Sequence, residues 1–179
     1  MKHGFVMIGL AVLMAGGCAR VSEDAWHGDW DITANAVEAN VDQAGYLPFG
    51  WHEGEIGPEV VNRPPYEGKG SHVGLAVLHP ISIREPARLR YRSTIPQASS
   101  VLSVTAAGHV LGDTVLRCQV GDQVVGEYVL DGLSWKTFTF DLTSYQHLSA
   151  PLELHIAAGG AEPWRFEHGF IDRIEFLGR

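Results

Sequence analysis

Hydrophobic and polar side chains alternate along most of the second half of the chain. In the run 87–95, Ala87 and Leu89 are predicted to point inward, while Arg88 and Arg90 point outward. A period of two is typical of a β-strand with one buried face. Comparable apolar or alternating runs occupy residues 74–79, 101–106, 115–120, 124–129, 135–142, 151–157 and 170–177.

Turn signals separate these runs. Pro80 and Pro96 each end a run, since proline fixes φ and lacks a backbone donor. Gly121-Asp122 stands between 115–120 and 124–129, which predicts a hairpin. Seven or eight short strands with almost no helix predict an all-β protein with an antiparallel β-sandwich.

The part before residue 73 is less regular. Residues 26–31 hold two tryptophans and form the first plausible ordered piece, and residues 34–44 fit either a helix or an irregular strand. Residues 45–73 are rich in Gly and Pro and are predicted to be loop-rich. We therefore expect a single domain over 26–179, with its core in 73–177.

Composition limits the partners. The 179 residues carry a formal net charge of −8, and no cluster of Lys and Arg stands out. Such a chain is repelled by phosphate backbones and by anionic lipid surfaces. Nucleic-acid binding is therefore not expected, and the length suits one domain with a proper core.

The first residues have the pattern of an export signal. Lys2 is followed by an apolar run to Met14 and then by Ala15-Gly16-Gly17-Cys18. A cysteine directly after small residues resembles the lipobox of bacterial lipoproteins. The resemblance implies a signal peptide over 1–17, lipidation of Cys18 and a polar tether over 18–25. The alternative is an ordinary secretion signal in which Cys18 falls near the cleavage site by chance.

The other cysteine has no partner if Cys18 is acylated. Cys118 lies in an alternating apolar run, so we expect a small buried side chain rather than a reactive thiol.

An ordered series of short motifs resembles the galactose-binding-domain-like jelly rolls of secreted bacterial proteins, including carbohydrate-binding modules of the NPCBM sort. The motifs are His79-Pro80, Pro86–Leu89, Thr94–Pro96, Leu102–Val104, Gly112-Asp113, Trp135, Phe140–Tyr145 and Trp164–Ile174. The resemblance implies a jelly-roll sandwich whose ligand binds at loops at one end or on a concave sheet face. Within the motifs, Asp141 or Thr143 is expected to cap a helical turn after a strand, and Trp135 is expected to be structural.

Sugar binding needs flat aromatic faces for the apolar side of a pyranose and planar polar groups for its hydroxyls. The aromatic candidates are Trp51, Tyr66 and Trp164, each of which fits equally well as a plug at the end of the core. The hydrogen-bonding candidates are Arg165, Glu167 and His109, and for His109 turn-building is the alternative role.

Metal binding and catalysis have weaker signals. Seven histidines outside the leader and the first ordered piece are scattered without ligand spacing, so no zinc site is expected. A structural calcium, which the resemblance allows, would draw on Asp42, Glu53, Glu55 or Glu175, but no calcium-loop motif exists. No cofactor is expected. No nucleophile elbow or phosphate loop is present, so an enzyme is not expected.

These observations predict a non-catalytic envelope lipoprotein that binds carbohydrate or another extracellular ligand. It would be anchored by lipid to the outer membrane or the cell surface, with no other contact to the membrane. One alternative is a structural lipoprotein that docks on another envelope protein through an exposed sheet face. Another is a small glycan hydrolase.

Overall fold

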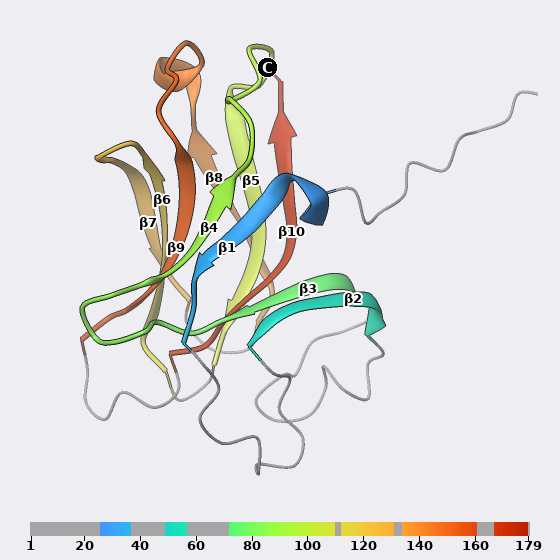
Figure 1. The fold of residues 1–179 in the computed structure, drawn as a ribbon, viewed down its shortest axis with the longest axis vertical. Helices are drawn as coiled ribbons and strands as arrows, with labels where there is room; N and C mark the ends of the chain where they lie inside the picture. Colours follow the sequence, from blue (N-terminus) through green and yellow to red (C-terminus); the bar gives the residue numbers. More distant parts are fainter. Residues whose placement is uncertain are drawn as a thin grey trace, which may run out of the picture.

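The protein is a sandwich of two five-stranded antiparallel sheets. The computed structural model describes residues 26–36, 49–56, 72–109, 112–130, 134–160 and 167–178. Sheet A has the order β1 (Trp30–Ala34), β4 (Ala87–Tyr91), β9 (Leu152–Ala158), β6 (Thr114–Val120) and β7 (Gln123–Val129). Sheet B has the order β2 (Gly50–Ile56), β3 (His72–Leu78), β10 (Gly169–Leu177), β5 (Val101–Gly108) and β8 (Lys136–Asp141) (Figure 1).

The strand order is that of a jelly roll. From β3 to β10 successive strands alternate between the two sheets, except for the hairpin formed by β6 and β7. β1 extends sheet A beyond β4, and β2 extends sheet B beyond β3. The prediction of an all-β jelly-roll sandwich is therefore confirmed.

The strand count is higher than the sequence suggested. The described residues hold ten strands rather than seven or eight, because β1 and β2 both lie before residue 73. β2 occupies residues that were predicted to be loop-rich, and backbone pairing with β3 forms it despite Gly50 and Gly54. Trp26 and Trp30 are buried, so the N-terminal ordered piece contributes to the core.

The core lies between the sheets and follows the period of two. In β9, Leu152, Leu154 and Ile156 face the core, and Leu89 of β4 lies opposite Leu154. Each fully buried side chain of this size stabilises the fold by about 1.5–3 kcal/mol. Cys118 is fully buried, and burial raises the pKa of its thiol to about 12, which confirms its role as a small apolar side chain.

One strand is shorter than predicted. The alternation suggested a strand over 87–95, but β4 ends at Tyr91. The next backbone N–H, that of Arg92, still donates to the carbonyl of Asp29 in the same register, but the partner strand β1 begins only at Trp30, so the pairing goes no further. Ile95 nevertheless reaches the core and is 3% exposed.

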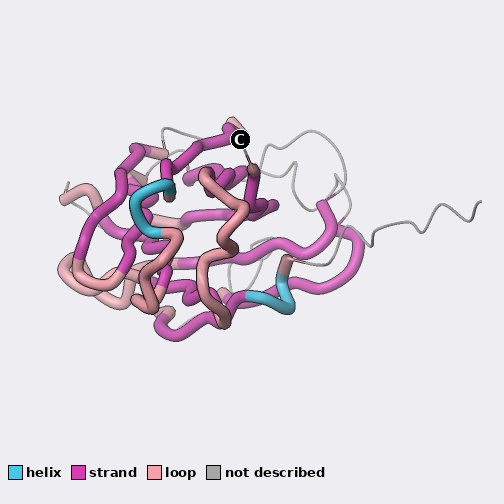
Figure 2. Tube along the Cα trace, turned by 90° about the horizontal axis from the view of Figure 1, so that it is seen from above, coloured by secondary structure: helices cyan, strands magenta, loops and turns pink. Residues whose placement is uncertain are grey.

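Short turns complete the fold. Gly121 has φ +57° in the β6–β7 hairpin, in the left-handed region that glycine adopts without strain. Of the two expected capping residues, Asp141 accepts a 2.8 Å hydrogen bond from the N–H of Thr143, the first residue of η2 (Thr143–Tyr145), although the N-cap position itself is Leu142 and has no side-chain capping bond. Apart from η2 and η1 (His27–Asp29), the described chain is strand and loop (Figure 2). No helix among the described residues has the length and apolar character to cross a membrane.

Trp135 was expected to be structural, and it is. Its side chain packs against a small second core formed by Leu75, Val77, Ala107 and Phe170.

Replacement of Gly108 by Ala should destabilise the fold. An added Cβ would lie 2.6 Å from the backbone oxygen of Leu130, and both backbones are held, Gly108 by pairing with Gly169 and Leu130 by the hydrogen bond from its N–H to the carbonyl of Thr114. We expect a loss of about 1–3 kcal/mol in the free energy of unfolding, measured by urea denaturation. Gly28→Ala is the matched control, since nothing lies within 4 Å of its Cβ position. Equal stability of the two variants would contradict this packing.

Candidate functional site

An open polar cleft lies on the outer face of sheet A, with a volume of about 630 Å³. Strands β4, β6 and β9 supply most of its walls, together with the β6–β7 turn. We call it the polar cleft; its lining residues are Pro86, Arg88, Arg90, Arg117, Gln119, Gly121, Asp122, Pro151, Glu153 and His155.

Strand register arranges the cleft in two rows. His155 of β9 lies between Arg88 of β4 and Arg117 of β6 in the first row. Glu153 lies between Arg90 and Gln119 in the second. Adjacent strands are about 4.8 Å apart and residues two apart share a face, so the six side chains form one compact polar surface.

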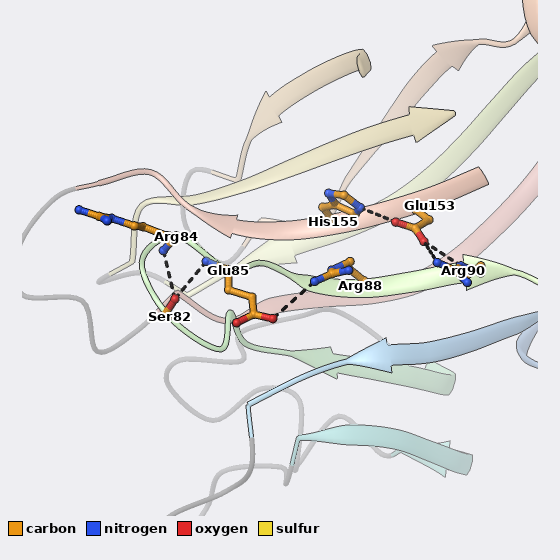
Figure 3. Close-up of polar contacts among 7 residues, drawn as sticks. All are labelled: Ser82, Arg84, Glu85, Arg88, Arg90, Glu153 and His155. Atoms are coloured by element: carbon orange, nitrogen blue, oxygen red, sulfur yellow. Dashed lines mark hydrogen bonds and ion pairs between the residues drawn. The ribbon is translucent and has the colours of Figure 1, made fainter. Parts of the chain in front are cut away.

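Glu153 links both rows. Its Oε1 accepts a 2.7 Å hydrogen bond from Nε of Arg90, and its Oε2 is 2.9 Å from Nε2 of His155 (Figure 3). Burial raises the pKa of Glu153, but the hydrogen bonds from His155 and Arg90 outweigh it and the net pKa is lowered. The carboxylate is therefore ionised at neutral pH.

His155 is neutral at neutral pH and keeps one acceptor atom. Burial lowers its pKa, the Glu153 carboxylate opposes this, and the charges of Arg117 and Arg88 lower it further. Because the carboxylate only accepts, Nε2 carries the proton and Nδ1 carries the lone pair. Nδ1 is buried and has no hydrogen-bond partner among the described residues.

The loop between β3 and β4 places Glu85 beside Arg88. The Ser82 hydroxyl accepts hydrogen bonds from the backbone N–H groups of Arg84 and Glu85, which closes a tight turn (Figure 3). Glu85 then lies 3.5 Å from NH2 of Arg88. Both side chains are substantially exposed, so this ion pair is weak.

Gln119 is also oriented. Its Nε2 donates a 2.7 Å hydrogen bond to the carbonyl of Gly121, at the hairpin turn. The lining of the polar cleft is thus largely held in place before any ligand arrives.

A second cluster of polar side chains lies at one end of sheet B. Gly169 at the start of β10 is the register partner of both Leu78 at the end of β3 and Gly108 at the end of β5. The residues just beyond these positions therefore come together. We call them the histidine cluster: His79, His109, Glu167 and His168.

The cluster is buried. The ring centroids of His79 and His109 lie 5.1 and 5.3 Å from that of His168, and Phe49 stacks on His79. Nε2 of His79 is 3.9 Å from Oε2 of Glu167, while its Nδ1 lies 2.7 Å from the carbonyl oxygen of Pro80, as suits a polar residue at a strand end.

Burial keeps these imidazoles neutral. It lowers the pKa of His79, and it lowers that of His109 to about 4. Burial, with the charges of His79 and His109, lowers the pKa of His168 to about 3. Within the described part of the chain, no group of three or more His, Cys, Asp or Glu residues has the arrangement of a metal site.

The residues predicted from the sequence do not gather in the polar cleft. His109 and Glu167 both belong to the histidine cluster and are 2% exposed. Trp51 on β2 contacts Trp26 and His27 and packs against the main core, which favours the packing alternative for this side chain. Four predicted residues lie outside the described part of the chain: Cys18, Tyr66, Trp164 and Arg165.

Two other sequence interpretations can be compared with the structure. The histidines are not all scattered, because sheet register brings His79, His109 and His168 together. Of the possible calcium donors, only Glu175 has a described side chain, and it lies 3.7 Å from Arg173.

Sequence reasoning did not single out the polar cleft. The alternation in 87–95 did place Arg88 and Arg90 on the outer face, and Glu153 and His155 alternate with leucines in the same way. The missing information was which strands are neighbours. The pairing of β4 with β9 unites residues more than 60 positions apart in the chain, such as Arg90 and Glu153, and the pairing of β6 with β9 adds Arg117 and Gln119.

Comparisons with known proteins show similarity in structure alone. No family model matches the chain, and no curated protein sequence matches it. Similar solved structures include the K2 cleaved adhesin domain of Lys-gingipain, with 13% identity and a TM-score of 0.47 over 84% of this chain and 90% of that one.

Two further similar structures show how varied the structurally similar proteins are. The carbohydrate-binding module CBM36 in complex with calcium and xylotriose has 18% identity and a TM-score of 0.37, over 51% of this chain and 73% of that one. A Stig cyclase from Fischerella sp. TAU has 16% identity and a TM-score of 0.46, with 82% of each chain covered. At such low identity and TM-score, these similarities assign neither a ligand nor an activity.

Acidification should destabilise the protein. Unfolded histidines take up protons near pH 6.5, whereas folded His109 and His168 do so only near pH 4 and 3. The unfolded chain therefore binds more protons in this window, and stability is lost as the pH falls through it. The expected loss is on the order of 1 kcal/mol per pH unit for each group, measured by urea unfolding between pH 7.5 and 4.5.

A variant pair tests the origin of this effect. His168→Gln should reduce the pH dependence, whereas His147→Gln, at an exposed position after η2, should leave it unchanged. Stability that stays constant down to pH 4.5 would contradict the burial of neutral imidazoles.

Proposed function

We propose that this protein binds carbohydrate without catalysis, in the polar cleft of sheet A. The observation that carries the proposal is the buried Nδ1 acceptor of His155, a residue that strand register places between Arg88 and Arg117. An acceptor beside strong donors suits a sugar hydroxyl, because a hydroxyl donates one hydrogen bond and accepts two.

The other lining groups support this reading. Arg90, Glu153 and Gln119 are planar polar groups, and each is oriented by a hydrogen bond within the protein. Each of these planar groups has two adjacent hydrogen-bonding atoms, which suits a pair of vicinal hydroxyls on a sugar. Because they are ordered in advance, little side-chain entropy is lost when a ligand binds.

The apolar side of a sugar would contact proline rather than an aromatic ring. Among the described residues that line the cleft, Pro86 and Pro151 supply the apolar rings, and no aromatic residue does so. This differs from the sequence-based expectation of stacking on Trp51, Tyr66 or Trp164.

A glycan array with the purified full chain, followed by calorimetry on its strongest hit, tests the proposal. His155→Gln retains an amide nitrogen to donate to Glu153, and the amide oxygen of the glutamine then lies away from the position that the Nδ1 acceptor occupies. We expect it to weaken binding roughly tenfold, because a ligand hydroxyl loses its partner.

The control is His147→Gln, which makes the same change at an exposed position and should bind as the unaltered chain does. Binding that survives His155→Gln undiminished would place the ligand elsewhere. The non-catalytic part of the proposal predicts that mass spectrometry finds the bound glycan unchanged in length after prolonged incubation.

We further propose that Cys18 carries the lipid that anchors the domain in a bacterial cell envelope. The support is the sequence alone: a basic start, an apolar run and small residues directly before the cysteine. Residues 18–25 would then act as the tether.

Metabolic labelling with an alkyne-bearing palmitate in a bacterial host measures this anchoring. The label and the membrane fractionation should both be lost in Cys18→Ser. Cys118→Ser changes the buried cysteine and should retain both. A chain with Cys18→Ser that still fractionates with membranes through a covalent lipid would contradict the assignment.

A further inference from the structure

The charges that line the polar cleft are unevenly balanced. Glu153 is already bonded on both oxygens, by Arg90 and by His155, so this pair of charges is satisfied. Arg88 and Arg117 have their carboxylate partners, Glu85 and Glu127, outside the cleft lining. The guanidinium groups of Arg88 and Arg117 therefore line the cleft while each keeps a surface ion pair of modest strength, and Asp122 supplies a second carboxylate to the lining.

Arg88 and Arg117 flank the same residue, His155. Arg88 and Arg117 are the register partners of His155 from the two neighbouring strands, so their Cα atoms are roughly 10 Å apart with the imidazole between them. Burial is the main cause that lowers the pKa of His155, and the positive charges of Arg117 and Arg88 add to it in the same direction. An anionic group above His155 would be attracted by both.

The Nδ1 acceptor of His155 restricts which anion fits. A carboxylate accepts hydrogen bonds from guanidinium groups, commonly two in parallel, but it cannot donate one to Nδ1. The ligand must therefore carry an anionic group and, beside it, a hydroxyl that donates. A fully ionised sulfate or phosphate offers no such donor of its own. A uronic acid offers both, since its carboxylate lies next to ring hydroxyls.

The negative net charge of the chain means that an acidic sugar would be held only by short-range contacts in the cleft. At −8, the chain repels polyanions at a distance. Affinity for an acidic sugar must therefore come from the guanidinium groups within the cleft, not from a general electrostatic attraction.

We propose that the polar cleft selects glycans that contain uronic acid, with the sugar carboxylate bound by Arg88 and Arg117 and a neighbouring hydroxyl donating to His155. This rests on the proposed carbohydrate binding in the same cleft and adds the chemical class of the ligand.

Calorimetry of the full chain tests the assignment with matched probes. Oligogalacturonate and oligomannuronate are compared with their methyl esters, which keep the ring hydroxyls but remove the charge. We expect one of the acids to bind at least about tenfold more tightly than its ester, because the ester cannot form charge-assisted hydrogen bonds with the two guanidinium groups.

Variants assign the preference to the two arginines. In the double variant Arg88→Gln, Arg117→Gln the ratio of acid to ester affinity should fall to near one. Arg84→Gln removes a guanidinium from the adjacent loop, where it does not line the cleft, and should leave the ratio unchanged.

The outcomes separate this inference from the proposed function. If the acids bind no better than their esters, or only neutral glycans bind and His155→Gln weakens them, selection of uronic acid is overturned while carbohydrate binding in the cleft stands. If the preference for acid persists in the double arginine variant, the carboxylate lies elsewhere and the inference is overturned. If no glycan binds at all, both proposals fail.

Discussion

The structure depends on one constraint: each sheet buries one face against the other, so alternate side chains along each strand must lie outside this shared core. Because side chains alternate along a strand, Leu152, Leu154 and Ile156 in the core require Glu153 and His155 to lie on the outer face. A register slip of one residue would bury charged groups and expose leucines. The polar cleft is thus fixed by the same packing that holds the two sheets together.

The position of β9 in sheet A explains why polar groups are buried outside the core. β4 and β6 flank β9, so long arginine side chains cover Glu153 and His155, which are 8% and 6% exposed. A buried carboxylate is costly unless it is bonded. Glu153 meets this requirement on both oxygens, but His155 does so on only one nitrogen. The remaining acceptor, Nδ1 of His155, is a buried atom of the cleft lining without a hydrogen-bond partner among the described residues, and the proposed ligand contact rests on it.

The alternation of residues allowed the strands, the hairpin at Gly121 and the outward face of Arg88 and Arg90 to be predicted from the sequence. Those features are local, and each is read within a few residues. β2 was missed because its glycines weaken the local pattern and only pairing with β3 makes it a strand. The cleft and the histidine cluster were missed for a related reason. Both consist of residues from non-consecutive strands, and a single sequence does not state which strands become neighbours.

The polar cleft and the histidine cluster have different physical consequences, although both contain neutral imidazoles. In the histidine cluster the rings contact one another and Phe49, so the neutral state contributes to stability and is lost on acidification. In the polar cleft the imidazole lies between Arg88 and Arg117, whose side chains are about one third exposed, at 35% and 33%. Recognition needs donors that solvent can reach together with an ordered acceptor. In the polar cleft, partly exposed guanidinium donors line the same surface as an ordered acceptor, which is why we propose that ligand binding occurs on sheet A.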